Sequence, residues 1–138
     1  MIVIERYDIR KLEDYIQNIT QYKKQLRFRE YELLESHEID NPEGGKSNLP
    51  GNPVEREVIK KTKDKKYNNL ANIVNGVDRL MDELNDDDME MIRLRYWDCP
   101  IDCNQWDQIA DRFFVSKTTI LRRRNAMLTK LANYIGYV

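Results

Sequence analysis

The sequence contains little cysteine and histidine, and it has no long apolar run. Two cysteines, Cys99 and Cys103, and one distant histidine, His37, cannot supply the four ligands of a structural zinc site, so we expect no bound metal. No stretch of about 18 apolar residues occurs, which argues against a membrane-spanning helix. The segment Met1 to Lys11 carries acidic side chains and lacks the apolar stretch of an export signal. We therefore expect a cytoplasmic protein without membrane contact.

Patterns for catalysis and nucleotide binding are also missing. His37 has no neighbouring nucleophile, and the cysteine pair has no neighbouring base. The segment Gly44-Gly45-Lys46-Ser47 resembles the end of a phosphate-binding loop, but the spacing of two glycines before Lys-Ser is absent and no buried strand precedes it. The sequence therefore predicts no catalytic residue, no cofactor and no enzymatic activity.

The composition favours long helices. Apolar residues make up 41% of the chain and charged residues 34%, which is too charged for a large compact core and too apolar for disorder. With 138 residues, the chain has room for one domain, or for a small domain beside an extended helical region. We expect an all-α fold in which long N-terminal helices precede a C-terminal helix-turn-helix DNA-binding domain.

Two helical segments flank a linker at residues 38–53, which is dense in proline, glycine and asparagine. The N-terminal helical segment, residues 1–37, is expected to form a helix over about Tyr7 to Ser36. Residues 54–84 are expected to form a second long helix, with a basic run from Lys60 to Lys66 that we interpret as a solvated face rather than a phosphate-contacting patch. The apolar seams of the two helices are Ile9, Leu12, Ile16, Ile19, Leu26 and Leu33, and Leu70, Ile73, Val77, Leu80 and Leu84.

These seams allow two arrangements. They fit an intermolecular coiled coil, which would make the protein a homo-oligomer, and they equally fit helices packed against each other within one monomer. We expect an oligomer, because one small helix-turn-helix buries too little DNA surface to bind an operator tightly.

The C-terminal segment, residues 85–138, begins with a helix-start signal and contains a two-helix motif. Asn85 before three aspartates is typical of a capped helix N-terminus, and Cys99-Pro100 should end that helix. Further on, four residues have the character that a helix-turn-helix requires: small Ala110 in the first helix, apolar Val115 in the turn, the N-cap Ser116, and Ile120 packing inward. The turn position usually given to glycine holds Phe114, which demands an altered or strained backbone.

The second helix of the motif should carry the DNA-binding residues. With Ile120 inward, the 100° helical step directs a set of residues toward the major groove, with side chains suited to base edges. We predict base contacts from Lys117, Thr118, Leu121, Arg122 and Asn125, and backbone contacts from Ser116, Arg123, Arg124 and Lys130. The alternative is an amphipathic helix pair with a merely solvated basic face.

The charge is unevenly distributed along the chain. The net charge is −1, yet residues 104–138 hold six basic and two acidic side chains. Such asymmetry concentrates the attraction for phosphate at one end of the sequence and leaves an acidic remainder.

Residues 84–130 resemble the fourth DNA-binding region of sigma factors, which also joins an acidic-capped helix ending in an Arg-Tyr pair to an Ile-Ala helix and a Val-Ser turn. About Ile39 to Val138 resembles the RinA/ArpU-type phage late transcription regulators more closely. The matching residues are Gly44-Gly45-Lys46-Ser47-Asn48, Pro53-Val54-Glu55, Arg95-Tyr96-Trp97, Trp106, Ile109-Ala110, Val115-Ser116, Thr119-Ile120 and Ile135-Gly136-Tyr137-Val138.

This resemblance implies a phage or prophage activator that binds double-stranded promoter DNA in a bacterial host cell and switches on late genes for packaging and morphogenesis. RNA polymerase is a candidate partner. Two alternatives stay open: a small-terminase-like packaging protein that recognises phage DNA as a closed ring, and a coiled-coil adaptor that binds no nucleic acid.

Overall fold

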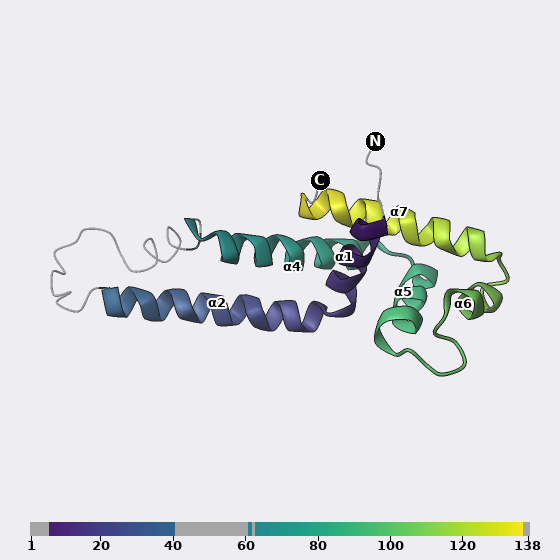
Figure 1. Cartoon of the computed structure of the whole chain (residues 1–138), viewed down its shortest axis with the longest axis horizontal. Helices are drawn as coiled ribbons and strands as arrows, with labels where there is room; N and C mark the ends of the chain where they lie inside the picture. Colours follow the sequence, from purple (N-terminus) through teal and green to yellow (C-terminus); the bar gives the residue numbers. More distant parts are fainter. Residues whose placement is uncertain (1–5, 41–60, 62, 137–138) are drawn as a thin grey trace. The chain divides into compact units, whose positions relative to one another are not determined.

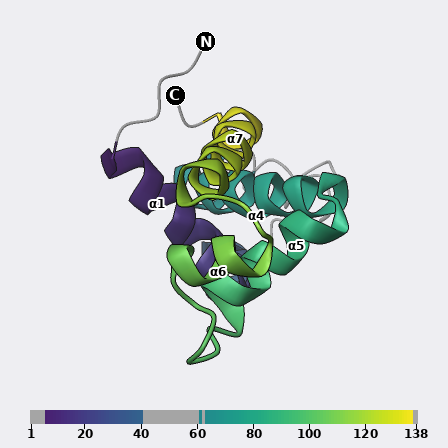
Figure 2. The ribbon, with the colours of Figure 1, turned by 90° about the vertical axis from the view of Figure 1, so that its right-hand side faces the viewer.

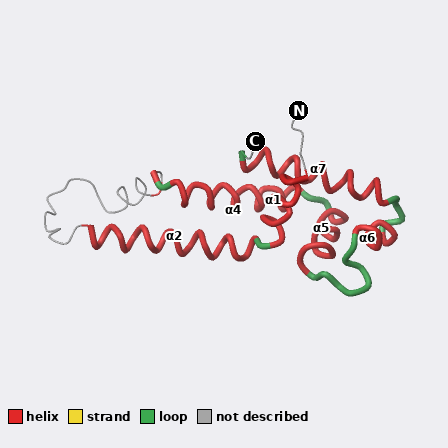
Figure 3. The backbone as a smooth tube through the Cα atoms, viewed as in Figure 1, coloured by secondary structure: helices red, strands yellow, loops and turns green. Residues whose placement is uncertain are grey.

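The computed structural model describes residues 6–40, 61 and 63–136 (Figure 1). Within these ranges the regular secondary structure is helical and contains no strand (Figure 3), which confirms the all-α prediction for this part of the chain. The elements are α1 (Arg6–Gln17), α2 (Ile19–Asp40), α4 (Lys65–Glu83), α5 (Asp86–Ile92), the π-helical η2 (Arg93–Trp97), α6 (Trp106–Arg112) and α7 (Lys117–Ile135). No helix in the described ranges is both long and apolar enough to cross a membrane.

The chain forms two compact units. The first, which we call the terminal unit, comprises Met1–Ile19 and Val74–Val138. The second, the hairpin unit, is Thr20–Ile73. These units divide the chain differently from the expected segments 1–37, 54–84 and 85–138, because α1 and the second half of α4 belong with the C-terminal helices. Of the expected linker, residues 38–40 lie in α2 and the rest lie outside the described residues.

The predicted single helix over Tyr7 to Ser36 is wrong, because the chain leaves the helix at Asn18. The Asn18 backbone N–H still donates to the Asp14 carbonyl at 2.9 Å, and its side-chain amide donates to the Asp14 carboxylate at 2.6 Å. The apolar seam is therefore split between two helices in different units.

Helix α1 is anchored in the terminal unit by its apolar face. Leu12 and Ile16 have no exposed surface, and α1 packs on α7 and on η2. From η2, the indole N–H of Trp97 donates to the Ile16 carbonyl at 3.0 Å, and the hydroxyl of Tyr96 donates to the Glu13 carboxylate. Burial, followed by the negative charge of Glu13, raises the pKa of Tyr96 well above its usual range.

Helix α5 begins as the sequence predicts. The side chain of Asn85 accepts from the backbone N–H of Asp88 at 2.8 Å, and Asp86, Asp87 and Asp88 occupy the first turn, where the helix dipole favours negative charge. The helix continues into η2 and ends before Cys99, whose φ of 46° is incompatible with further right-handed helix.

Helices α4 and α7 approach each other closely at Gly76. A Cβ atom built at this glycine would lie 2.6 Å from Cγ1 of Ile135, so a larger side chain would force the two helices apart or displace Ile135. One turn further along α4, the guanidinium of Arg79 lies 4.0 Å from the ring centroid of Tyr134.

In the hairpin unit, α2 is tied to the start of α4 by a bidentate ion pair. Arg29 donates to the two carboxylate oxygens of Asp64 at 2.9 and 2.5 Å. Asp64 also accepts the backbone N–H of Tyr67 at 2.7 Å, so it caps α4. The predicted continuous helix from Val54 is wrong at this point, because the Asp64 backbone is not helical; residues 54–60, including Lys60, lie outside the described residues.

The Arg29–Asp64 pair predicts an acid-sensitive contribution to stability. Hydrogen bonding from Arg29 lowers the pKa of Asp64 from 3.8 to about 2. A carboxyl with a lowered folded-state pKa stabilises the fold fully above its unfolded pKa and loses that contribution as the pH falls toward its folded pKa. We expect Asp64→Asn, which retains a capping oxygen, to lower the free energy of unfolding by about 1–2 kcal/mol at pH 7 and by about half as much at pH 3.

Urea unfolding followed by circular dichroism at pH 7, 4 and 3 measures this difference. Glu32→Gln is the matched control, because Glu32 contacts Arg29 at only 3.4 Å and from a more exposed position. A loss for Asp64→Asn that is independent of pH would contradict the ion-pair origin of the stabilisation.

Candidate nucleic-acid interface

The first helix of the expected motif, α6, is fixed at its start by a side-chain cap. The Gln108 side-chain oxygen accepts the backbone N–H groups of Asn104 and Gln105, both at 3.0 Å. These donors precede the helix and have no partner in its own ladder. Buried Ile109 and Ala110 then form the face of α6 that packs on α7. The small side chain of Ala110 therefore lies where the sequence analysis expected it.

The turn between α6 and α7 is a Schellman motif built without glycine. Val115 N–H donates to the Ala110 carbonyl at 3.0 Å, and Phe114 N–H donates to the Asp111 carbonyl at 3.1 Å, which is the hydrogen-bond pair of that motif. Phe114 takes the left-handed position with φ of 57°, and its side chain is 95% exposed. Of the two backbones expected for a phenylalanine at this position, altered or strained, the structure has the strained one, and the turn stays tight.

Helix α7 starts where the sequence predicts. Ser116 accepts the backbone N–H of Thr119 at 3.1 Å, and Ile120 has no exposed surface. Figure 2 looks nearly along α7, with α6 beside its first turns. The cap and the buried Ile120 together fix which face of α7 meets the core and which face meets solvent.

The predicted base-contacting residues divide into two groups. Thr118, Arg122 and Asn125 are exposed and share one outward face of α7 by the 100° step. Leu121 is half-buried and Lys117 lies at the edge, where its ammonium group contacts the Asp107 carboxylate at 3.0 Å. The exposed face therefore holds three of the five residues, and Ala126, which the sequence analysis did not single out, extends it.

The predicted backbone-contacting residues are also unequal. Arg123 and Lys130 are exposed. Ser116 uses its oxygen to cap α7, and Arg124 is half-buried. The guanidinium of Arg124 lies 5.7 Å from the Trp106 ring centroid, and its Nε and Nη2 donate to the Asn125 side-chain oxygen at 3.1 and 3.0 Å.

A cluster around Trp106 was not anticipated. Arg95 lies 5.5 Å from the same ring centroid and donates to the Asn104 carbonyl at 3.0 Å, while Tyr96 meets the ring edge-on. Two guanidinium groups therefore contact one indole, an arrangement favoured by the negative face of the ring. The sequence analysis noted the Arg95-Tyr96 pair and Trp106 separately. Their spacing in the sequence does not show that these side chains contact one another in the fold.

Side chains suited to a metal site are dispersed. Within the described ranges, no group of three or more histidine, cysteine, aspartate or glutamate residues is placed to hold a metal ion. Cys99 is exposed and Cys103 is buried, and both are free thiols. His37 lies where side chains are not described.

One family model, described as a protein of unknown function (DUF722), matches residues 5–133. The match spans nearly the whole chain, and the chain belongs to that family. No curated protein and no solved structure matches it.

The strained turn predicts a stabilising substitution. Phe114→Gly should raise the free energy of unfolding by about 1 kcal/mol, because glycine adopts a positive φ without steric cost and the exposed ring gives little packing. Chemical denaturation measures the change. Ile101→Gly is the matched control: this side chain is 93% exposed, and its residue is not among those with positive φ, so it should give no gain. A destabilised Phe114→Gly would show that the ring makes contacts that stabilise the turn.

Proposed function

We propose that this DUF722 protein is a sequence-specific regulator of transcription that binds double-stranded DNA through α6 and α7, with α7 as the recognition helix. The observation that carries the proposal is the outward face of α7, where Thr118, Arg122 and Asn125 follow a Ser-capped helix start and a tight turn. A recognition helix contacts base edges in the major groove through its N-terminal residues, and these three lie in its first turns.

The side chains of this face suit base reading. Arginine donates two hydrogen bonds to guanine, asparagine pairs with adenine, and the methyl group of threonine contacts that of thymine. The side-chain oxygen of Asn125 accepts from Arg124, so Asn125 would read adenine after Arg124 turns toward a phosphate. We therefore assign the main base contact to Arg122, which is exposed and is not held by another described side chain in a salt bridge or hydrogen bond.

Phosphate binding falls to residues beside and beyond this face. Lys130 follows Arg122 by eight residues, about 12 Å along the helix axis, which takes it away from the base pairs that Arg122 reaches. Arg123 projects from the flank of α7. Lys117 can exchange the exposed Asp107 carboxylate for a phosphate, since an exposed ion pair stabilises the fold by less than about 1 kcal/mol.

The biological setting is taken from the resemblance of the sequence to the RinA/ArpU-type phage late transcription regulators. We propose a phage or prophage activator that acts in the bacterial cytoplasm, switches on late genes for packaging and morphogenesis, and contacts RNA polymerase while bound to the promoter. Its activity is binding, without catalysis. Selection of bound fragments from the phage and host genomes, followed by footprinting, tests this directly: a protected site upstream of late genes supports it, and recovery of random fragments refutes it.

Separate variants distinguish base reading from phosphate binding. We expect Arg122→Ala to weaken binding to the selected site by about 1–3 kcal/mol and to relax specificity at one base pair, because a bidentate contact is lost. Lys130→Ala should weaken binding to selected and random DNA about equally. Electrophoretic titration of both DNAs measures the effects, and equal losses for the two variants on both DNAs would contradict the assignment of base reading to Arg122.

The salt dependence of affinity gives an independent measure of phosphate contacts. Two copies on one operator that engage about six to ten phosphates should give a log–log slope of about −5 to −9, at about −0.9 per phosphate. Fluorescence anisotropy across a range of salt concentrations measures it, with light scattering for the stoichiometry. A monomer with a slope near about −2 would contradict tight operator binding, and a closed ring would favour a small-terminase-like packaging role.

A further inference from the structure

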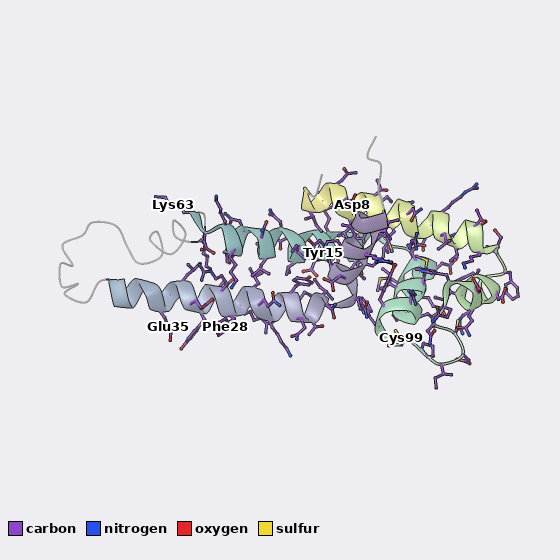
Figure 4. All side chains as sticks on the ribbon, in the orientation of Figure 1. Asp8, Tyr15, Phe28, Glu35, Lys63 and Cys99 are labelled. Atoms are coloured by element: carbon purple, nitrogen blue, oxygen red, sulfur yellow. The ribbon has the colours of Figure 1, made fainter. Side chains whose placement is uncertain are left out.

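One face of α2 in the hairpin unit exposes aromatic side chains. Phe28 is 63% exposed and Tyr31 is 59% exposed. Figure 4 shows Phe28 and Glu35 on the side of α2 that faces away from the start of α4. Two large aromatic residues side by side on a solvated helix are typical of an interaction surface.

The spacing of this face is that of a coiled-coil seam. Lys24, Phe28, Tyr31 and Glu35 follow one another at steps of four, three and four residues. All four are exposed. The seam is distinct from the one predicted from the sequence, whose members Leu26 and Leu33 are half-buried within the monomer.

This face is complementary to the same face of a second α2 helix that runs in the opposite direction. Counting outward from the bond between Arg29 and Glu30, Phe28 exchanges with Tyr31, Lys24 with Glu35, and Arg27 with Glu32. An antiparallel pair of α2 helices would therefore place an aromatic residue against an aromatic residue and a cation against an anion at each step. Isologous interfaces across a two-fold axis require such self-complementarity.

Most charges of the face are available for new partners, although Glu32 already contacts Arg29 at 3.4 Å. Among the described residues, Lys24, Arg27 and Glu35 take part in no ion pair. A parallel pairing would bring Lys24 against Lys24 and Glu35 against Glu35, which is unfavourable. The charge pattern therefore selects the antiparallel orientation.

A groove beside Phe28 has room for an aromatic ring. Its volume is about 340 Å³, and it is lined by Lys24, Gln25, Phe28, Glu32 and Lys66. In the antiparallel arrangement Tyr31 of a second copy lies opposite Phe28, next to this groove. An aromatic anchor in a pocket of the partner is the usual centre of a stable interface.

We propose that the protein dimerises through antiparallel pairing of this α2 face with the same face of a second copy, about a two-fold axis between Arg29 and Glu30. One pair of helix faces buries an area near the lower end of specific interfaces, about 1,200 Å², so the dimer should form reversibly at micromolar concentration. The proposal concerns the hairpin unit and requires no DNA, so it fails or holds separately from the proposed function.

The test is sedimentation equilibrium of the full chain without DNA, with charge exchange at Lys24 and Glu35. We expect Lys24→Glu and Glu35→Lys each to weaken the dimer about tenfold, because the symmetry places two like-charge pairs in each variant dimer. An equimolar mixture of the two variants, and the double variant that carries both changes in one chain, should recover wild-type affinity.

Aromatic variants provide a second arm. Phe28→Asn should abolish the dimer at about 100 µM, because it removes the anchor of the interface. Phe114→Asn, an equal change at an exposed aromatic residue of the terminal unit, should leave the dimer intact. Circular dichroism verifies that each variant is folded. A wild-type chain that stays monomeric at about 500 µM, a double variant that is not rescued, or an assembly larger than a dimer would overturn the proposal.

Discussion

The burial of α1 is the constraint on which the terminal unit depends. Leu12 and Ile16 have no exposed surface, and they come from the opposite end of the sequence to the helices that they pack against. Removing a fully buried leucine side chain costs about 2–5 kcal/mol, a large share of the stability of a small unit. The Trp97 hydrogen bond to the Ile16 carbonyl adds a directional contact that fixes α1 against η2. The C-terminal helices are thus part of a core that the N-terminus completes.

The turn before α7 contains a strained residue, Phe114, at the point that sets the direction of α7 relative to α6. A glycine at position 114 would relax the left-handed backbone, but the Schellman hydrogen bonds and the Ser116 cap hold the turn with phenylalanine in place. A residue held in a left-handed conformation costs about 1–2 kcal/mol. Such strain persists only where its surroundings fix the backbone, and here buried Ala110 and Ile120 lie on either side of the turn.

Sequence reasoning succeeded where the cause of structure is local. The Asn85 and Ser116 caps, the stop at Cys99-Pro100 and the positive φ at Phe114 each depend on residues within one turn, and the structure has all of them. It failed where the cause is distant or conditional: Asn18 has no helix-breaking signature by type, and the cap at Asp64 is stabilised by Arg29, 35 residues away. The outward positions of Arg122 and Thr118 follow from helical periodicity, whereas the contacts of Arg124 with Trp106 and Asn125 depend on packing that spacing does not encode.

The two proposed surfaces, the outward face of α7 and the exposed face of α2, would together allow the protein to discriminate an operator from other DNA. A single recognition helix with about three base-reading side chains cannot discriminate an operator from a genome of competing sites, since each correct base pair contributes only about 1–3 kcal/mol. Doubling the readout requires a second copy related by a two-fold axis, and the antiparallel α2 pairing proposed from the reversed charge order between Lys24 and Glu35 would supply one. Dimeric helix-turn-helix proteins read pseudo-palindromic half-sites for this reason. If both proposals hold, dissociation at low concentration would halve the phosphate contacts of the bound complex, so DNA occupancy would rise steeply as the protein accumulates.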